Sequence, residues 1–260
     1  MTQTDRPEYL QRKRFFDSLI TVYGRKPVLE LLQDDSLSVY RLHLADSNQR
    51  NGIIKDIEAL ARGRGIDIHH HSRDALARIS RNKSQDQGVA ADVACPNYRQ
   101  LDDFLGTKRP FQLLALDRVT NPQNLGMVIR SVGASPMDGL LLPGKGGAPL
   151  SPLAIKASAG TAFKCPILRC ETLEAGLKSC LSDGADIAIL AADGEQTLAE
   201  YEPKGSVVYV LGNETDGVST TIGNLANRRL RIPMGNGVES LNVAITAALI
   251  AFRDVVARGR

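Results

Sequence analysis

The sequence predicts an α/β protein built from two domains. Short strand and helix patterns alternate through residues 20–95, whereas near-continuous apolar runs appear only after residue 110. A polar and charged stretch at 97–109 separates the two regions. Alternating patterns are typical of half-buried elements, and wholly apolar runs are typical of strands that are covered on both faces. We therefore expect an N-terminal extension at 1–19, a small domain at 20–96, a linker at 97–109 and a larger domain at 110–260.

The small domain reads as helices and strands in alternation. It starts with a turn and a short helix at 23–32, where Pro27 is tolerated in the first turn. The remaining elements are a strand at 39–44, a helix at 53–61 that ends at Gly63, a strand that starts at 66–68, a short helix at 73–79 and a strand at 89–93. This αβαβαβ unit of about 75 residues has the size of a small domain.

The larger domain reads as buried strands separated by helices. The apolar runs lie at 113–116, 140–142, 187–190 and 207–211, and the helical patterns at 125–132, 152–159, 173–181 and 241–256. Such runs predict a mostly parallel sheet with helices on both faces. Ligands in such folds bind at the carboxyl ends of the strands, and the polar, glycine-rich segments of this domain follow the strands.

Three of these polar loops carry candidate functional residues or a glycine pattern. The loop at 117–130 holds Asn121, Asn124 and Gly126 ahead of Arg130. The loop PGKGGAP at 143–149 lacks the spacing of a phosphate loop, so a mobile surface loop is the better interpretation. The loop GNETDGVS at 212–219 lacks the glycine spacing of a dinucleotide-binding fingerprint.

The fourth loop lies within Arg229–Phe252, which reads RLRIPMGNGVESLNVAITAALIAF. A short strand pattern leads through a loop with two glycines into an almost wholly apolar helix. Ser240 is a candidate N-cap, because its hydroxyl can accept a hydrogen bond from an amide of the first turn. The stretch either offers backbone amides to a polar ligand or is only a tight turn between strand and helix.

Composition and motifs exclude several classes of protein. With 43% hydrophobic and 23% charged residues, and with no apolar run long enough to span a bilayer, the chain is typical of a globular protein. The N-terminus has no secretory pattern, and the four cysteines form no CxxC pair, so we expect a cytoplasmic protein with reduced thiols. We expect no metal site, because strand alternation sends neighbours in the triplet His69, His70 and His71 to opposite faces.

The net charge of +3 lies in residues 1–109, which hold 18 Lys and Arg against 15 Asp and Glu. Basic residues concentrate at 12–14, at Arg99 and at 108–109. Such a concentration can neutralise the phosphates of a nucleic acid, although a solvated surface of mixed charge has the same composition.

Three of the loops together resemble the signature motifs of one enzyme family. NPQNLGMVIR at 121–130, VLGNETDGVS at 210–219 and IPMGNGVESLNVAI at 232–245 resemble the three motifs of the SpoU (TrmH-like) RNA ribose 2'-O-methyltransferases of the SPOUT superfamily. Residues 20–95, including QGVAA at 87–91, resemble the ribosomal-protein-L30e-like substrate-binding domain that often precedes them.

The resemblance implies a fold, a cofactor and a partner. The fold would be an α/β-knot, in which the last segment of the C-terminal domain forms a deep trefoil knot, after a small L30e-like α/β domain. The cofactor would be S-adenosylmethionine, with S-adenosylhomocysteine as the product, and the enzyme would be a homodimer whose site uses both subunits. The cofactor contacts implied are Leu211, Gly212, Asn213, Glu214, Gly217, Ile232, Met234, Ser240 and Leu241, and the catalytic positions implied are Asn124, Arg130, Ser240 and Asn242.

The chain departs from the family pattern at two positions. Asn121 stands where Asp is common, and Asn236 stands where Gly is common. Both departures leave Asn124, Arg130 and the triplet at 240–242 intact, so we expect activity to survive. Arg130 is expected to clamp a phosphate and stabilise developing negative charge, because a guanidinium hardly ever gives up its proton. The general base stays open.

The substrate implied is RNA, read through the small domain. Sequence-selective RNA readers mostly engage unpaired loops, so ribosomal RNA is the leading substrate. Transfer RNA and a role in antibiotic resistance through ribosomal RNA are the alternatives. A non-catalytic RNA-binding protein of the same fold is the alternative from a different class.

Overall fold

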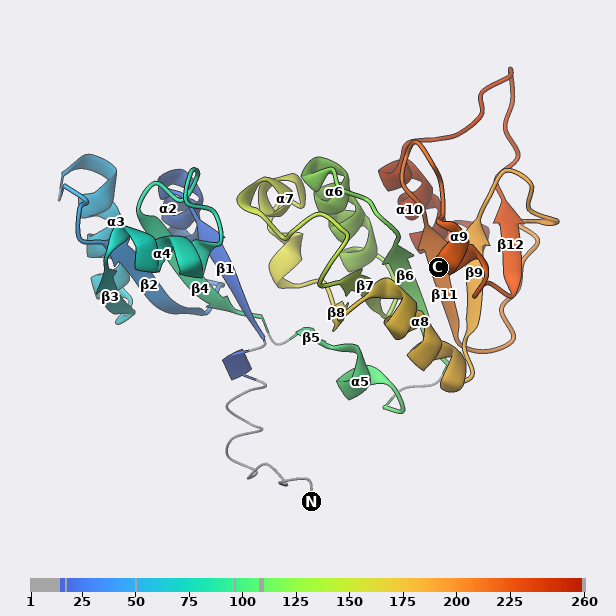
Figure 1. Cartoon of the computed structure of the whole chain (residues 1–260), viewed down its shortest axis with the longest axis horizontal. Coiled ribbons are helices and arrows are strands. Elements are labelled where there is room, and N and C mark those ends of the chain that lie inside the picture. The colour runs from blue at the N-terminus through green and yellow to red at the C-terminus, as the bar shows by residue number, and fades with distance from the viewer. Residues whose placement is uncertain (1–14, 17, 50, 96, 108–109, 259–260) are drawn as a thin grey trace. The chain divides into compact units, whose positions relative to one another are not determined.

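The computed structural model describes residues 15–16, 18–49, 51–95, 97–107 and 110–258 (Figure 1). Most of the N-terminal extension expected at 1–19 and the basic residues expected at 12–14 and 108–109 lie outside the described residues. The chain divides into two compact units, residues 1–96 and residues 97–260. In the described residues, no helix combines the length and apolar character needed to cross a bilayer.

The first unit is a four-stranded sheet in the order β1-β4-β2-β3. Strand β4 runs antiparallel to both of its neighbours, and β2 and β3 are parallel. The strands are β1 (Leu19–Tyr23), β2 (Val39–Ala45), β3 (Asp67–His71) and β4 (Val89–Ala94), and the helices are α2 (Arg25–Gln33), α3 (Gly52–Gly63) and α4 (Arg73–Ser80). The expected helices and strands of this unit are therefore present.

Strand β1 is the element of this unit that sequence patterns did not predict. Its sequence LITVY follows a charged segment and is too short to show a clear period. Pairing with β4 buries Ile20 and Val22, which are 4% and 1% exposed. The strand thus depends on a partner that lies about 70 residues further along the chain.

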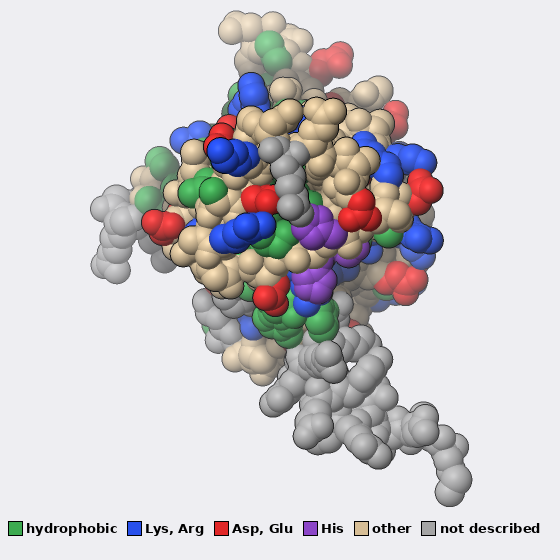
Figure 2. Space-filling view, turned by 90° about the vertical axis from the view of Figure 1, so that its left-hand side faces the viewer, with side chains coloured by type: hydrophobic (Ala, Val, Ile, Leu, Met, Phe, Trp, Pro, Cys, Tyr) green, Lys and Arg blue, Asp and Glu red, His purple; other side chains and the backbone are tan. Residues whose placement is uncertain are grey.

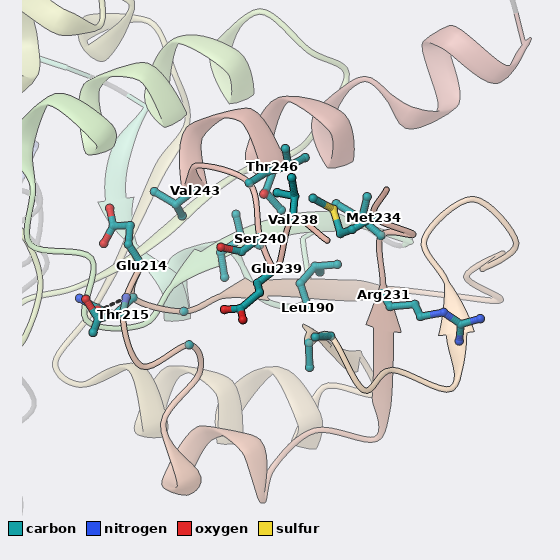
Figure 3. Close-up of a pocket in the computed structure, with 18 of the residues that line it drawn as sticks. Leu190, Glu214, Thr215, Arg231, Met234, Val238, Glu239, Ser240, Val243 and Thr246 are labelled. Atoms are coloured by element: carbon teal, nitrogen blue, oxygen red, sulfur yellow. Dashed lines mark hydrogen bonds between the residues drawn. The ribbon is translucent and has the colours of Figure 1, made fainter. Parts of the chain in front are cut away.

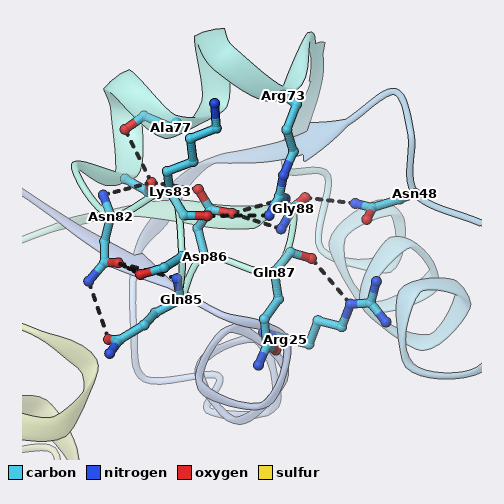
Figure 4. Close-up of polar contacts among 12 residues, drawn as sticks. Arg25, Asn48, Arg73, Ala77, Asn82, Lys83, Gln85, Asp86, Gln87 and Gly88 are labelled. Carbon is cyan, nitrogen blue, oxygen red and sulfur yellow. Dashed lines mark hydrogen bonds and ion pairs between the residues drawn. The ribbon is translucent and has the colours of Figure 1, made fainter.

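The QGVAA segment at 87–91 enters β4 from a loop that is held by a buried carboxylate (Figure 4). Asp86 is 0% exposed and accepts hydrogen bonds from the Ser80 hydroxyl at 2.8 Å and the Gly88 amide at 2.9 Å. It also forms an ion pair with Arg73 at 3.0 Å, so the buried charge is paired. Gly88 has a φ of +78°, a left-handed conformation that glycine adopts without strain, and a Cβ there would lie 2.5 Å from the Asn48 side chain, so the position favours glycine.

The second unit is built on an eight-stranded parallel sheet in the order β10-β12-β9-β11-β6-β7-β8-β5. The strands are β5 (Tyr98–Gln100), β6 (Gln112–Leu116), β7 (Gly139–Pro143), β8 (Ile167–Cys170), β9 (Asp186–Leu190), β10 (Gln196–Thr197), β11 (Val207–Leu211) and β12 (Arg228–Arg231). The helices are α5 (Leu101–Phe104), α6 (Pro122–Gly133), α7 (Pro152–Ala157), η1 (Thr161–Phe163), α8 (Leu173–Ser182), α9 (Thr220–Gly223), α10 (Val243–Ala251) and α11 (Arg253–Arg258).

Helices flank both faces of this sheet, as the apolar runs predicted (Figure 1). All five residues of β11 are buried, and β11 lies between β9 and β6 in the sheet interior. Helices α5, α8 and α9 pack on one face around Leu113, Val208 and Val210. Helix α6 packs against α7 and α10 on the other. A central strand buried on both faces explains the continuous apolar sequence of residues 207–211.

Two expectations are corrected by the second unit. The segment 97–109, expected as a linker, supplies β5 and α5, and β5 pairs with β8 at the edge of the sheet. Its strand is only three residues long, too short for a recognisable period. The helix expected at 241–256 is two helices, α10 and α11, with Phe252 between them as the C-cap of α10.

Candidate active site

The sheet order brings the polar loops together. Strands β12, β9, β11 and β6 are neighbours in that order and run parallel, so their carboxyl ends share one edge. Three of the loops that leave this edge carry the segments singled out in the sequence, at 117–130, 212–219 and 232–242. These loops are distant in sequence and adjacent in space because of the strand order.

A cavity of about 870 Å³ opens between two of these loops, at 212–219 and 232–242, and the end of β9 (Figure 3). All nine residues that the motif resemblance implied as cofactor contacts line it, namely Leu211, Gly212, Asn213, Glu214, Gly217, Ile232, Met234, Ser240 and Leu241. Apolar side chains from 232–243 lie beside the carboxylates of Glu214 and Glu239 in its lining. The volume is in the range of pockets that hold small organic ligands.

One wall of the cavity was not predicted from the sequence. Leu190, Ala191 and Ala192, at the end of β9 and just after it, also line the cavity. The run at 187–190 was recognised as a strand, but its neighbour in the sheet was not. The available signal was that two small residues, Ala191 and Ala192, follow this strand.

Glycine shapes the loop after β11. Asn213 and Gly217 pair through their backbones, with N to O distances of 3.1 Å and 2.9 Å. A Cβ at Gly212 would lie 2.0 Å from the carbonyl carbon of Gly217, so no other residue fits there. The Asn213 carboxamide accepts a hydrogen bond from the Thr215 amide at 2.8 Å and donates to the Arg118 carbonyl at 3.0 Å. The turn is therefore fixed to the loop after β6.

Asp117 and Arg118 hold the loop after β6 against the loop after β11. The Asp117 carboxylate is buried and accepts a hydrogen bond from the Ser219 amide at 2.6 Å. The Arg118 guanidinium donates to the Gly217 carbonyl at 3.3 Å and lies 3.6 Å from the Asp216 carboxylate. The loop after β6 thus braces the loop after β11, which lines the cavity.

A chain of three side chains links all three motifs. Asn124 donates a hydrogen bond from its carboxamide to the Glu214 carboxylate, and it accepts one from Asn242 at 3.2 Å. Asn124 is 6% exposed, so these bonds satisfy both ends of a buried amide. Asn242 lies 118 residues beyond Asn124 in the sequence.

The N-cap of the last apolar helix differs from the expectation. Ser240 was expected to cap it, but Asn242 is the N-cap of α10 and accepts a hydrogen bond from the Ala244 amide at 2.8 Å. The chain stays non-helical until residue 242, so Ser240 lies in the loop that lines the cavity. Both serine and asparagine are good caps, and sequence preference alone could not separate them.

Both departures from the family pattern keep a suitable geometry. Asn236 has a φ of +56°, and asparagine tolerates this left-handed conformation better than any residue type except glycine. Asn121 caps α6 by accepting a hydrogen bond from the Gln123 amide at 2.9 Å, a task that aspartate also performs. Neither Asn121 nor Asn236 lines the cavity.

Arg130 is not brought to the cavity within one chain. It is exposed on α6 and is not among the lining residues. Asn124 and Arg130 are six positions apart, which places them on different faces of a helix. The structure therefore links Asn124 and Asn242 to Glu214 by hydrogen bonds, although neither asparagine lines the cavity. It places Ser240 in the cavity lining and leaves Arg130 on the surface.

Histidines gather in the first unit (Figure 2). His43 is 2.9 Å from His71 and 3.0 Å from the Asp92 carboxylate, and His69 stacks on His71. Burial and the neighbouring His43 lower the pKa of His71. In the described part of the chain, no group of three His, Cys, Asp or Glu side chains has the arrangement of a metal site. Figure 2 shows acidic and basic side chains mixed around the histidines, without a one-sided basic patch on that face.

Comparison with known protein families shows which family this chain belongs to. The model of the SpoU rRNA methylase family matches residues 112–252, which include all three motif loops and the cavity. The chain belongs to the SpoU rRNA methylase family. A second model, RNA 2'-O ribose methyltransferase substrate binding, matches residues 21–99 of this SpoU-family chain, which cover most of the first unit.

Curated relatives of this SpoU protein include mycobacterial proteins. An uncharacterized tRNA/rRNA methyltransferase of Mycobacterium sp. (strain KMS) is 33% identical over 238 residues, covering 90% of this chain and 75% of the relative. A protein of the same description from Mycolicibacterium smegmatis is 34% identical over the same shares of the two chains. Sequence similarity thus extends through both units.

Solved structures share the fold of this SpoU protein. The SpoU methyltransferase AviRb from Streptomyces viridochromogenes, in complex with AdoMet, matches with a TM-score of 0.63 and 22% identity over 97% of this chain and 94% of that chain. An AdoMet-bound rRNA methyltransferase from Sinorhizobium meliloti matches with a TM-score of 0.63 and 22% identity over 99% and 97%. The two-unit α/β architecture is therefore that of SpoU methyltransferases.

Proposed function

We propose that the protein is an S-adenosylmethionine-dependent methyltransferase that methylates a ribose 2'-hydroxyl in RNA. The observation that carries this proposal is the convergence of nine motif residues from two loops on one cavity. The AdoMet complexes of AviRb and of the Sinorhizobium meliloti enzyme support the choice of cofactor.

The cavity suits a nucleoside that carries a positive charge. Leu211, Ile232 and Leu241 offer apolar surface for a nucleoside, and the backbone of the tight turn at 212–217 offers polar groups. The carboxylates of Glu214 and Glu239 in the cavity lining would attract a positively charged ligand. When bound, the cofactor supplies an activated methyl group on a sulfonium. The cavity residues named above can hold this cofactor without a metal ion.

Positioning is the main task of the protein in such a displacement. Holding two reactants in line can supply roughly 7 to 11 kcal/mol of a barrier. The hydrogen bonds from Asn242 to Asn124 and from Asn124 to Glu214 fix the three motifs relative to one another. Arg130 clamps a phosphate of the RNA and stabilises negative charge as the hydroxyl loses its proton.

The exposed position of Arg130 favours a homodimer. Met127 on α6 and Ile245 and Leu249 on α10 are 42%, 53% and 45% exposed, and the two helices pack against each other. Helix α10 reads VAITAALIA, in which Thr246 is the one polar residue, so it has no polar face to turn to solvent. A second copy on these helices would cover the apolar side chains and bring Arg130 to the partner's cavity. The proposal includes the deep trefoil knot of the family in residues 110–260.

RNA is bound through the first unit in this proposal. The substrate-binding model that matches residues 21–99 supports this assignment. We propose ribosomal RNA as the substrate, in the cytoplasm, and transfer RNA as the second candidate, because the curated relatives are described as tRNA/rRNA methyltransferases. A role in antibiotic resistance would use the same chemistry on ribosomal RNA.

Calorimetry with S-adenosylmethionine and tritium-methyl transfer to total RNA test the activity together. We expect binding and transfer to a ribose 2'-hydroxyl. Cofactor binding without transfer to any RNA would instead favour a non-catalytic RNA-binding protein of this fold, and absence of cofactor binding would refute the site. Mapping 2'-O-methylation across ribosomal and transfer RNA, with and without the gene, identifies the nucleotide.

Arg130→Ala tests the role of the exposed arginine. We expect transfer to fall by at least about 100-fold, because removal of one charge-stabilising donor costs about 2.7 kcal/mol or more. Cofactor affinity should change less than about twofold, since the proposal assigns Arg130 to a phosphate of the RNA and not to the cofactor. Lys178→Ala is the control, an exposed cation on α8 that should leave both quantities unchanged. Unchanged transfer in Arg130→Ala would remove Arg130 from the reaction.

A further inference from the structure

Strand β12 carries three arginines in the sequence RRLR, and two of them reach the loop that follows β9. The loop covers residues 191–195 and leads into β10. It supplies Ala191 and Ala192 to the lining of the cavity, directly after Leu190. What fixes this loop therefore fixes one wall of the cavity.

The backbone of the loop lies against β12. The Ala191 amide donates to the Leu230 carbonyl at 2.9 Å, and the Gly194 amide donates to the Ala191 carbonyl at 3.1 Å. A Cβ at Gly194 would lie 2.5 Å from the Leu230 carbonyl carbon, so only glycine permits this approach. The loop is a compact turn pressed onto the strand.

The side chain of Arg231 adds hydrogen bonds between β12 and this loop. One of its terminal nitrogens donates to the Gly194 carbonyl at 2.7 Å and to the Glu195 carbonyl at 3.1 Å. Arg231 itself lines the cavity, and Figure 3 shows its side chain extending away from Ser240 and Glu239. The apolar stem thus belongs to the cavity wall, and the guanidinium binds the far side of the loop.

The other two arginines of β12 contribute less to the wall. Arg229 binds the Asp193 carboxylate at 2.6 Å and 2.8 Å, but the two side chains are 42% and 72% exposed, and such surface pairs stabilise little. Arg228 lies 3.4 Å from Asp186, at the start of β9 and away from the loop. Arg231 differs from Arg228 and Arg229 because its side chain donates hydrogen bonds to backbone carbonyls of the loop.

We propose that Arg231 is a positioning residue that fixes residues 191–195 as a wall of the cavity and so raises affinity for the nucleoside cofactor. The inference rests on the proposed function, because that function places S-adenosylmethionine in the cavity. A wall that is already in place removes the entropic cost of ordering it when the ligand binds. Arg231 touches no reacting atom in this role, so it acts on binding and not on the chemical step.

Hydrogen exchange of the unliganded protein tests whether Arg231 holds the loop. Arg231→Met keeps an apolar stem and removes the donors, and Arg228→Met is the matched control on the same strand. We expect the hydrogen-bonded amides of Ala191 and Gly194 to exchange at least about tenfold faster in Arg231→Met, which corresponds to about 1.4 kcal/mol of lost protection, and at an unchanged rate in Arg228→Met. Unchanged exchange in Arg231→Met would overturn the inference.

Calorimetry and kinetics test the effect on the cofactor. We expect Arg231→Met to raise the Kd and KM for S-adenosylmethionine about tenfold and to leave kcat at saturating cofactor within about twofold. Arg231→Lys, which keeps one donor, should fall between the wild type and Arg231→Met. Faster exchange with an unchanged Kd, or an equal loss in kcat, would overturn the positioning role. Absence of cofactor binding by the wild type would refute the proposed function instead, and the exchange experiment would still decide whether Arg231 fixes the loop.

Discussion

Asparagine side chains make many of the hydrogen bonds around the candidate site. Asn121 caps α6 and Asn242 caps α10, and Asn213 bonds the loop after β6. Asn124 joins the carboxylate of Glu214 to Asn242. A carboxamide both donates and accepts, which lets one residue link two loops. A sequence pattern reveals such residues as candidates, but it does not reveal their partners.

The carboxyl group of Asp92, in the first unit, predicts how the stability of the protein depends on pH. Burial opposes ionisation of Asp92, but hydrogen bonds from His43 and Thr21 outweigh it and lower the pKa of Asp92 below its usual 3.8. A lowered pKa of a carboxyl in the folded state stabilises the protein above pH 3.8, and this stabilisation is lost as the pH falls through the lowered pKa.

Asp92→Asn should therefore lower the free energy of unfolding by about 1 to 3 kcal/mol at pH 7. The difference from the wild type should shrink as the pH falls from 3.8 through the lowered pKa, since both proteins are neutral at this position once Asp92 is protonated. Urea unfolding at a series of pH values measures it. Asp74→Asn is the control, because the pair of Asp74 with Lys83 is exposed and its loss should have little effect. A difference that stays constant with pH would contradict the assignment to the charge of Asp92.

Helix α6 shows how an element positions the site. Its N-terminus presents Asn124 to the other motifs, and its other faces pack against α7 and α10. The contact with α7 is close because Gly126 faces it. A Cβ at Gly126 would lie 2.3 Å from the Ala154 carbonyl oxygen and 2.5 Å from the Ala157 side chain. The small residue thus sets how near α6 lies to α7, and so where Asn124 is held.

Gly126→Ala should destabilise the protein by about 1 to 3 kcal/mol, because overpacking outweighs the better helix propensity of alanine. It should also weaken methyl transfer, since α6 must shift to relieve the clash. Gly63→Ala is the control, because a Cβ there meets no atom within 4 Å and the residue lies within α3. That variant should be neutral or more stable by up to about 1 kcal/mol. Thermal unfolding of both variants distinguishes packing from propensity.

The whole molecule is expected to act as a pair of chains. The apolar side chains exposed on α6 and α10 include Ile245 and Leu249, which are four residues apart and so share one face of α10. If a second chain covers this face, α10 needs no polar side for contact with solvent. It would also place Arg130, exposed on α6, at an interface between subunits rather than at an isolated surface.

Ile245→Glu combined with Leu249→Glu should convert a dimer into a monomer, because two buried carboxylates on each subunit would lack partners. Light scattering after size exclusion measures the mass. Methyl transfer should fall with the loss of the dimer if Arg130 serves the partner's site. Val256→Glu is the control, since Val256 is 80% exposed on α11 and should leave the mass unchanged. A wild type that is monomeric at all concentrations would refute the dimer.

The sequence alone predicted the elements with strong local patterns and the motifs that reveal the family. The five buried residues of β11 and the apolar helix α10 were predicted from hydrophobic runs. Strands β1 and β5 were missed, because a segment of five or three residues has no reliable period and becomes a strand only by pairing. The cap at Asn242 was missed because two good capping residues lie two positions apart.

The tertiary structure decided which of these residues meet. The strand order β12-β9-β11-β6 brings together loops that are separated by about a hundred residues, and it adds Leu190 and its neighbours to a cavity that the motifs only partly defined. Tertiary packing also buries Asn124 and leaves Arg130 exposed, although both lie in one motif. Local sequence records periodicity, capping and turn preferences, whereas contacts between distant segments depend on the sheet that all of them share.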